Sequence, residues 1–174
     1  MFFVAIIYKK TFSPPQTNVL LPQNTKTETK PDIVIEDTQL NVFGFNKISN
    51  CTIDADKSNF FQNNQKVMCE NARCNIKVKN DTATLTSPTA IVDQKEKTLF
   101  LPENVYGTFK NMEFKSDNAF YDSTKQTIAH KNTTLVCENP NLIIKSDNCL
   151  LDLKEEKIDL KDNVYSTIKL RNKP

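Results

Sequence analysis

The feature that most constrains this chain is a repeat of about 30 residues, which occurs four times between residues 53 and 160. In each copy, six positions of similar character follow one another with steps of 2, 3, 2, 7 and 2 residues. The copies begin at Ile53, Leu85, Phe114 and Ile144, so their starts lie 32, 29 and 30 residues apart. Steps of two are typical of β-strands, and the step of seven spans a polar turn. The repeat therefore predicts four tandem β-hairpins.

The six repeat positions are expected to share the inner face of one sheet. They are Ile53, Ala55, Ser58, Phe60, Val67 and Cys69 in the first copy; Leu85, Ser87, Ala90, Val92, Leu99 and Leu101 in the second; Phe114, Ser116, Ala119, Tyr121, Ile128 and His130 in the third; and Ile144, Ser146, Cys149, Leu151, Ile158 and Leu160 in the fourth. Small residues between large ones in the first strand predict a wide trough along the inner face.

The step of three interrupts the alternation inside the first strand of each hairpin. One extra residue there, a β-bulge, would bend the strand and keep both of its halves facing inward. Strict alternation is the rival register, and it would turn Ile91, Phe120, Leu150, Thr89, Asn118 and Asn148 inward. We favour the bulge because burying an unpaired asparagine costs more than burying a small residue.

The remaining sequence supports an all-β fold. No window has an apolar stripe of helical period and length, and the turns use Asn and Asp, which tolerate a left-handed backbone. Four hairpins preceded by one or two strands predict a long, mostly antiparallel sheet over residues 32–170, which must curl to bury its apolar face. We expect an open, folded-over sheet. Periodicity alone leaves open whether the trough is free or is a packed core filled by side chains.

The two ends of the chain differ from the repeat region. Residues 1–8 form an apolar stub. Eight residues are too few to span a bilayer, which takes about 20, so the stub is either an apolar N-terminus that docks on the fold or the end of a membrane anchor. Residues 9–31 include four prolines among Thr, Asn, Gln and Lys, a composition typical of an extended linker. Residues 171–174 form a short tail.

The composition argues against an enzyme. Two glycines exclude a P-loop and a dinucleotide-binding loop, and a net charge of +2 without a basic patch argues against nucleic acid. The one histidine, His130, lies at an inward position, where a core or rim residue is expected. The five cysteines include no Cys-x-x-Cys motif, so neither a zinc site nor a cofactor is expected. Free cysteines acting as small apolar side chains are expected. The alternative is a disulfide, for which Cys51 and Cys74 are the candidate pair, because the first hairpin brings Cys51 close to the Cys74–Ile76 stretch.

The repeated units resemble the lipopolysaccharide-export proteins of the Gram-negative envelope, above all the bitopic inner-membrane (LptC-like) component and its relative, the soluble (LptA/OstA-type) bridge protein. The resemblance rests on "CTIDADKSNFF", "TLTSPTAIVDQKEKTLFLPENV", "FKSDNAFYDSTKQTIA" and "IIKSDNCLLDLKEEKIDLKDNV" and covers about residues 33–170. It implies an open β-jellyroll in the periplasm, anchored in the inner membrane by a single span. Two other functions remain open: the soluble bridge protein itself, or a structural β-repeat protein without ligand.

The resemblance also implies partners and site residues. The trough would accept lipopolysaccharide from the inner-membrane ABC transporter and pass it to the bridge protein, without chemistry on the lipid. The implied lipid-facing residues are Phe60, Leu85, Ala90, Val92, Leu99, Leu101, Phe114, Ala119, Tyr121, Ile128, Ile144, Cys149, Leu151, Ile158 and Leu160. The implied partner-binding edges are Ile33 and Ile35 at one end, for the transporter, and Val164, Ser166, Ile168 and Leu170 at the other, for strand addition to the bridge protein.

Overall fold

The computed structural model describes residues 30–43, 49–78, 81–137 and 142–168, and these residues form an almost purely β structure. Its strands are β1 (Ile33–Val42), β2 (Ser49–Phe61), β3 (Lys66–Val78), β4 (Asp81–Asp93), β5 (Thr98–Leu101), β6 (Val105–Phe109), β7 (Met112–Ser116), β8 (Asn118–Asp122), β9 (Thr127–Cys137), β10 (Leu142–Asp152), β11 (Lys157–Lys161) and β12 (Tyr165–Ile168). One short 3-10 helix, η1 (Gln62–Asn64), lies in the turn between β2 and β3. The predicted all-β class is confirmed.

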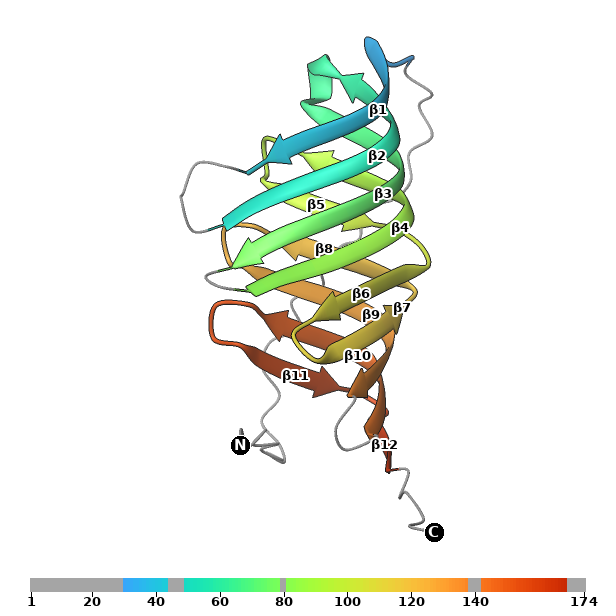
Figure 1. Ribbon diagram of the computed structural model, residues 1–174, viewed down its shortest axis with the longest axis vertical. Helices are drawn as coiled ribbons and strands as arrows, with labels where there is room; N and C mark the ends of the chain where they lie inside the picture. Colours follow the sequence, from blue (N-terminus) through green and yellow to red (C-terminus); the bar gives the residue numbers. More distant parts are fainter. Residues whose placement is uncertain (1–29, 44–48, 79–80, 138–141, 169–174) are drawn as a thin grey trace.

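All twelve strands belong to one sheet, and every pairing in it is antiparallel. The strands are stacked along the long axis of the molecule, with β1 at one end and β11 and β12 at the other (Figure 1). Three long strands each have two short partners: β4 pairs with β5 and β6, β9 with β7 and β8, and β10 with β11 and β12. The predicted tandem hairpins are confirmed.

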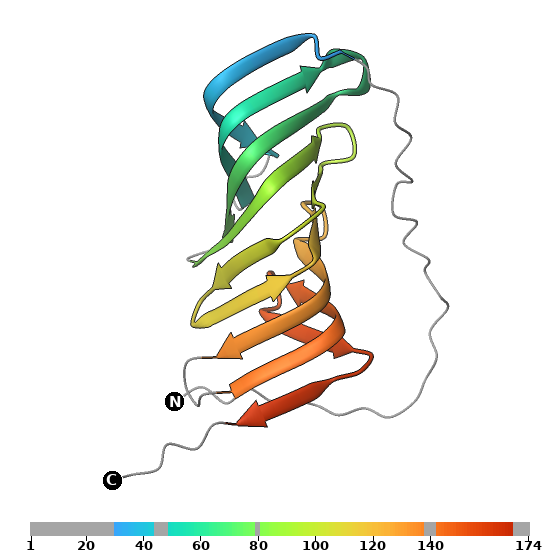
Figure 2. The same cartoon turned by 90° about the vertical axis from the view of Figure 1, so that its right-hand side faces the viewer.

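The sheet is folded over, so that each long strand crosses from one limb to the other (Figure 2). Limb A consists of residues 38–42, 49–55, 72–78, 81–87, 105–116, 133–137, 142–146 and 165–168. Limb B consists of residues 33–36, 57–61, 66–70, 89–101, 118–131 and 148–161. The inner faces of the limbs contact each other: the Phe43 and Tyr121 ring centroids lie 6.3 Å apart, and those of Phe114 and His130 lie 4.7 Å apart. The apolar core therefore lies between the limbs.

The residues on both sides of the step of three face inward, as predicted. The predicted bulge, however, is wrong for the long strands. In the β1–β2 pair, Glu36 faces Lys57 and Thr38 faces Ala55, so one residue lies between these pairs on each strand. The pairs β2–β3, β3–β4 and β9–β10 also keep one register throughout. Neighbouring long strands thus break alternation together, at a shared crease, and no extra residue is needed.

One-residue offsets do occur where a strand is interrupted. Val92 on β4 pairs with Leu99 on β5, and Thr86 on β4 pairs with Tyr106 on β6. The two β4 residues lie six positions apart, whereas their partners lie seven positions apart. The same one-residue offset occurs between β11 and β12. There, three positions along β10 face four positions along the two short strands. These offsets account for the division of a repeat's second strand into two short strands.

Asparagine and aspartate form the outer side of the crease. Asp37, Asn71 and Asn132 lie inside strands with φ values of 48°, 50° and 49°, a left-handed conformation that few residues other than glycine tolerate. The asparagine side chains donate to carboxylates of neighbouring strands. These bonds run from Asn71 Nδ2 to Asp56 (2.9 Å), from Asn132 Nδ2 to Asp117 (2.6 Å) and from Asn163 Nδ2 to Asp147 (2.7 Å). Asn and Asp were expected in turns, and here they also bend strands.

Two rows of mostly small residues line the inner side of the crease, which we call the inner crease rows. The limb A row contains Thr38, Ala55, Ala72, Ser87, Val105, Ser116, Thr133 and Ser146, and the limb B row contains Ser58, Cys69, Ala90, Leu101, Ala119, His130 and Cys149, all of them buried. The two rows face each other at a concave bend, where large side chains would collide. The small residues at the third position of each repeat, Ser58, Ala90, Ala119 and Cys149, therefore share one row, and this row lies at the closed bend of the fold.

Gly107 on β6 is required for space beside Phe114. The two residues are direct partners in the β6–β7 pair, and a Cβ on Gly107 would lie 2.0 Å from Phe114 Cε2. We expect Gly107→Ala to lower the free energy of unfolding by about 1–3 kcal/mol, because the ring of Phe114 must be displaced. Urea titration measures this loss. Phe114→Leu in the Gly107→Ala background should recover part of it, and a Gly107→Ala protein as stable as the parent would contradict this account.

Candidate functional site

The residues predicted to line the trough all face the inside of the fold. Twelve of the fifteen are at most 8% exposed: Leu85, Ala90, Val92, Leu99, Leu101, Phe114, Ala119, Tyr121, Ile128, Ile144, Cys149 and Leu151. Phe60, Ile158 and Leu160 are partly buried and pack against this core. In the rival register, Leu150 would point inward, but its side chain is 37% exposed. The residues that face inward are therefore those that the repeat steps predict, and not those of the rival register.

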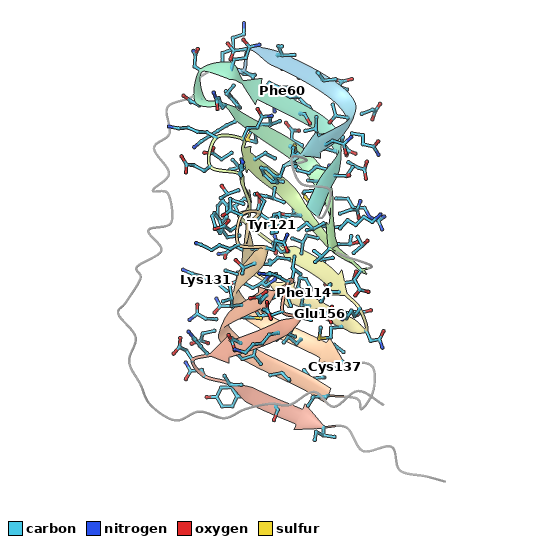
Figure 3. All side chains as sticks on the ribbon, turned by 90° about the vertical axis from the view of Figure 1, so that its left-hand side faces the viewer. Phe60, Phe114, Tyr121, Lys131, Cys137 and Glu156 are labelled. Atoms are coloured by element: carbon cyan, nitrogen blue, oxygen red, sulfur yellow. The ribbon has the colours of Figure 1, made fainter. Side chains whose placement is uncertain are left out.

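The space between the limbs is filled by side chains in the described part of the chain. The buried apolar residues form a core cluster that extends from Val42 to Leu153. Phe60, Tyr121 and Phe114 follow one another down the long axis of this core (Figure 3). Periodicity left open whether the trough is free or is a packed core. In this state of the molecule, it is a packed core. A ligand would enter by displacing contacts between the limbs.

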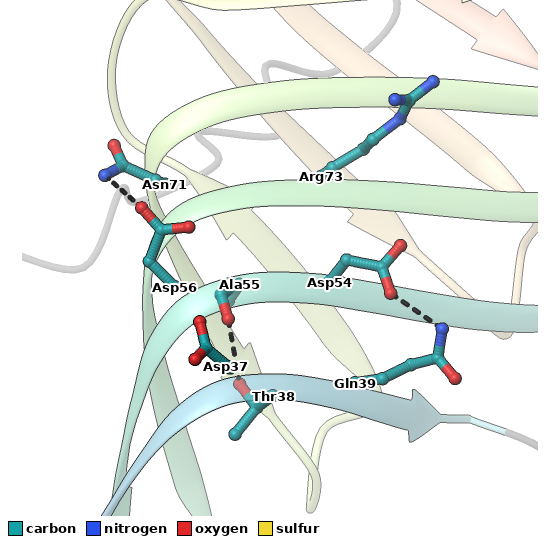
Figure 4. Close-up of a pocket in the computed structure, with 8 residues that line it drawn as sticks. All are labelled: Asp37, Thr38, Gln39, Asp54, Ala55, Asp56, Asn71 and Arg73. Atoms are coloured by element: carbon teal, nitrogen blue, oxygen red, sulfur yellow. Dashed lines mark hydrogen bonds between the residues drawn. The ribbon is translucent and has the colours of Figure 1, made fainter.

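Two hollows on the protein surface are lined mainly by polar side chains. One lies on the outside of β1–β3 near the crease and is lined by Asp37, Thr38, Gln39, Asp54, Ala55, Asp56, Asn71 and Arg73 (Figure 4). Another is formed by turn residues 63–66, 93, 95 and 96. Neither has a large apolar side chain in its lining. No group of three His, Cys, Asp or Glu residues within the described part of the chain could hold a metal ion.

Polar side chains of the inner crease rows are mostly paired within the fold. The hydroxyl groups of Thr38 and Ser58 lie 2.6 Å apart across the crease, and Ser87 Oγ donates to the Glu103 carbonyl at 2.6 Å. Ser146 Oγ donates to the Asn148 carbonyl at 3.1 Å. These bonds meet the requirement that buried hydroxyls find partners.

His130 and Thr133 on β9 are exceptions to this pattern. Ser116 Oγ lies 3.1 Å from His130 Nδ1, but His130 Nε2 and Thr133 Oγ1 are buried without a hydrogen-bond partner. Burial in an apolar setting lowers the pKa of His130 to about 4, so the imidazole is neutral at pH 7. The sequence pointed to His130 through its inward repeat position, but not to Thr133, because only two inward positions were assigned to each second strand.

Five free cysteines occur in the chain, and four of them are buried. Cys51 faces Ile76 in the β2–β3 register, while Cys74 faces Ile53, so the candidate disulfide partners are diagonal neighbours. The pKa of Cys51 is raised to about 12, mainly by burial and to a smaller extent by the nearby Cys69. Burial also raises the pKa of Cys149 to about 12. Thiols of this kind stay protonated and act as small apolar side chains.

An ion pair joins the two limbs at the open side of the fold. Lys110, in the turn between β6 and β7 on limb A, bonds Glu156 in the turn between β10 and β11 on limb B. Asp81 also lies 3.5 Å from the Lys110 ammonium group. The hydrogen bond that Lys110 donates to Glu156 is the main cause of the raised pKa of Lys110. Because the pair is exposed to solvent, it restrains the mouth of the fold only weakly.

Both ends of the sheet have exposed apolar edge strands. Among the described strands, β1 pairs only with β2, and its Ile33, Val34 and Ile35 are 45%, 49% and 45% exposed. At the other end β12 pairs only with β10, and Ile168 is 58% exposed. Val164 and Ser166 are exposed as well, whereas Leu170 lies outside the described residues. The expected partner edges are thus free strand edges wherever the structure describes them.

The apolar stub and most of the linker fall within residues 1–29, outside the described residues. In the part of the chain that is described, no helix is long and apolar enough to cross a membrane. The predicted anchor therefore stays a prediction.

Comparisons with known proteins agree with the fold and with the resemblance. No curated protein matches the chain in a sequence search. Among solved structures, the chain is similar to LptH of Pseudomonas aeruginosa, the LptA-homologous periplasmic component of a lipopolysaccharide transport device. The TM-score is 0.56 at 9% sequence identity, over 69% of this chain and 95% of that one, which shows a shared β-jellyroll fold. The family model for lipopolysaccharide-assembly, LptC-related proteins matches residues 1–169, so this chain belongs to the LptC-related family.

Proposed function

We propose that this protein is a non-enzymatic component of lipopolysaccharide export. It accepts lipopolysaccharide from the inner-membrane ABC transporter and passes it to a periplasmic bridge protein. Its folded domain lies in the periplasm, held by a single membrane span to which residues 1–8 belong. Membership of the LptC-related family supports the role in lipopolysaccharide transport.

The observation that carries this proposal is the continuous apolar interior between two free strand edges. The core runs along the sheet from Val42 on β1 to Leu151 on β10, and Ile158 and Leu160 on β11 pack against it. A jellyroll of another protein that added its strand to either edge would extend this interior. Acyl chains could then move along a path shielded from water, while the sugar groups stay at the open side.

The packed interior is compatible with this role because the limbs are joined mainly by apolar contacts. Strand pairing runs along each limb, and the limbs are covalently continuous at the crease. Across the open side they meet through side chains, such as Phe43 with Tyr121, and through the Lys110–Glu156 ion pair. An acyl chain that replaces these contacts exchanges one apolar neighbour for another, so the core stays shielded from water.

Site-specific photo-crosslinking in cells tests the lipid path. We expect a photoreactive aromatic residue at Phe114 or Tyr121 to capture lipopolysaccharide, because both side chains face the interior and are 4% and 1% exposed. The same residue at Lys115, which is exposed on the outer face of β7, serves as the matched control and should capture none. Equal labelling at all three positions would contradict an internal lipid path.

Two other functions are tested by the same experiment. The soluble bridge protein is the second candidate, because LptH, whose fold this chain shares, is an LptA-homologous periplasmic component. Internal crosslinks in a protein that fractionates without membranes would select that function. The filled interior favours a structural repeat protein without ligand, and absence of crosslinks at both internal positions would select it.

A further inference from the structure

Two polar atoms inside the fold have no partner within the described part of the chain: His130 Nε2 and Thr133 Oγ1. Their residues are only 3% and 2% exposed. Both belong to the inner crease rows, His130 on limb B and Thr133 on limb A, and the left-handed Asn132 between them turns both side chains inward. The two unpaired atoms therefore flank the crease at the same level of the long axis.

The neighbouring polar groups are already used. Ser116 is bonded to Nδ1 of His130, which leaves Nε2 as the free atom of that ring. Ser146, the strand partner of Thr133, donates its hydroxyl to the Asn148 carbonyl. The remaining surroundings are apolar: the Phe114 ring meets the His130 ring edge-on at 4.7 Å, and Ala119 and Cys149 flank His130 in the sheet. His130 Nε2 and Thr133 Oγ1 are thus unpaired in a crease whose other buried hydroxyls have partners.

Buried hydrogen-bonding groups are almost always paired, and an unpaired one is costly. An ordinary core position does not require a polar side chain here, since the repeat counterparts of His130 include Leu101 and Leu160. Because the imidazole is neutral at pH 7, it suits a neutral hydroxyl or carbonyl group better than an anion. His130 and Thr133 lie three residues apart on β9 and both face inward, so a ligand that entered at this part of the crease would meet both side chains.

We propose that His130 and Thr133 form a hydrogen-bonding site for a neutral polar group carried on an acyl chain, such as a hydroxyl near its head. This inference rests on the proposed function, since it assumes that acyl chains enter the interior. The inference adds that the interior of the fold prefers some acyl chains to others. A hydroxylated chain satisfies the two atoms, whereas a plain chain leaves them unpaired.

Competition binding with two simple probes tests the site. The purified full chain is titrated with tetradecanoate and with 3-hydroxytetradecanoate at pH 7. We expect the hydroxylated acid to bind about fivefold more tightly, as one added buried hydrogen bond implies. Thr133→Val, which keeps the side-chain shape, and His130→Leu should both bring the affinity ratio close to one.

Thr134→Val is the matched control, because Thr134 is the next residue on β9 and faces outward, and it should keep the parent ratio. Equal affinities of the parent protein for the two acids would overturn the site, as would an unchanged ratio in Thr133→Val. Both results would leave acyl binding, and thus the proposed function, intact. Failure of the parent protein to bind either acid would overturn both proposals. Melting temperatures verify folding, and Thr133→Val alone decides the outcome should His130→Leu fail to fold.

Discussion

Ile168→Pro is expected to abolish co-purification of this protein with its periplasmic bridge partner while leaving its own domain folded. Ile168 ends β12, which pairs with β10 on one side only. Proline removes a backbone donor and fits poorly in a strand that must pair on both sides. Main-chain hydrogen bonds supply most of the affinity in strand addition, so a distorted edge should lose the partner.

The domain should survive this change because β12 contributes little to the core. All four of its residues are exposed, and Tyr165 and Ile168 are 67% and 58% exposed. We expect a small shift in melting temperature.

Ile168→Val provides the matched control, since it keeps the backbone donor and the strand preference, and it should bind normally. Ile35→Pro, at the opposite edge, should spare the bridge contact and weaken the contact with the transporter. Normal partner binding by Ile168→Pro, or unfolding of the whole domain, would contradict strand addition at β12.

His130→Leu is expected to remove a large part of the acid sensitivity of the fold. The pKa of His130 is lowered to about 4 by burial, against a reference value of 6.5. Between these values the unfolded chain binds a proton that the folded chain does not, so stability is complete above about pH 6.5 and falls as the pH drops toward 4. A shift of this size corresponds to about 3 kcal/mol lost between pH 7 and pH 4.

Urea unfolding at a series of pH values measures this dependence. Carboxylates also titrate in this range, so the informative quantity is the difference between the parent protein and His130→Leu. Thr133→Val is the control, because it alters the adjacent unpaired atom and leaves the imidazole in place, and it should keep the parent slope. Parallel pH profiles for the parent and His130→Leu would show that the imidazole does not stay neutral in the fold.

The hairpins and their inward faces could be predicted from the sequence because strand periodicity is a local property. The repeat steps identified which residues are buried, including Leu85, Tyr121 and Leu151, and the polar turns separated the strands. The same reasoning supported the family resemblance, since a family is recognised by a pattern of residues along the chain. The edge strands β1 and β12 of the described residues also followed, because the repeats do not close on themselves.

The cause of the crease could not be predicted in this way. A step of three within one strand has the same sequence pattern whether that strand bulges alone or all neighbours bend together. Only the register of adjacent strands distinguishes the two. It is the same on both sides of Asp37 in β1–β2 and on both sides of Asn71 in β2–β3. Strand register is a relation between segments, so a local pattern does not contain it.

The sequence by itself determined the all-β class, the tandem hairpins, the inward register and the family. The tertiary structure alone decided that the limbs close onto a filled core, that Lys110 meets Glu156 across the mouth, and that His130 and Thr133 are left without partners. The physical reason is the range of the interactions. Alternation and turn chemistry act between residues a few positions apart, whereas packing and hydrogen-bond satisfaction depend on side chains that only the folding of the sheet brings together.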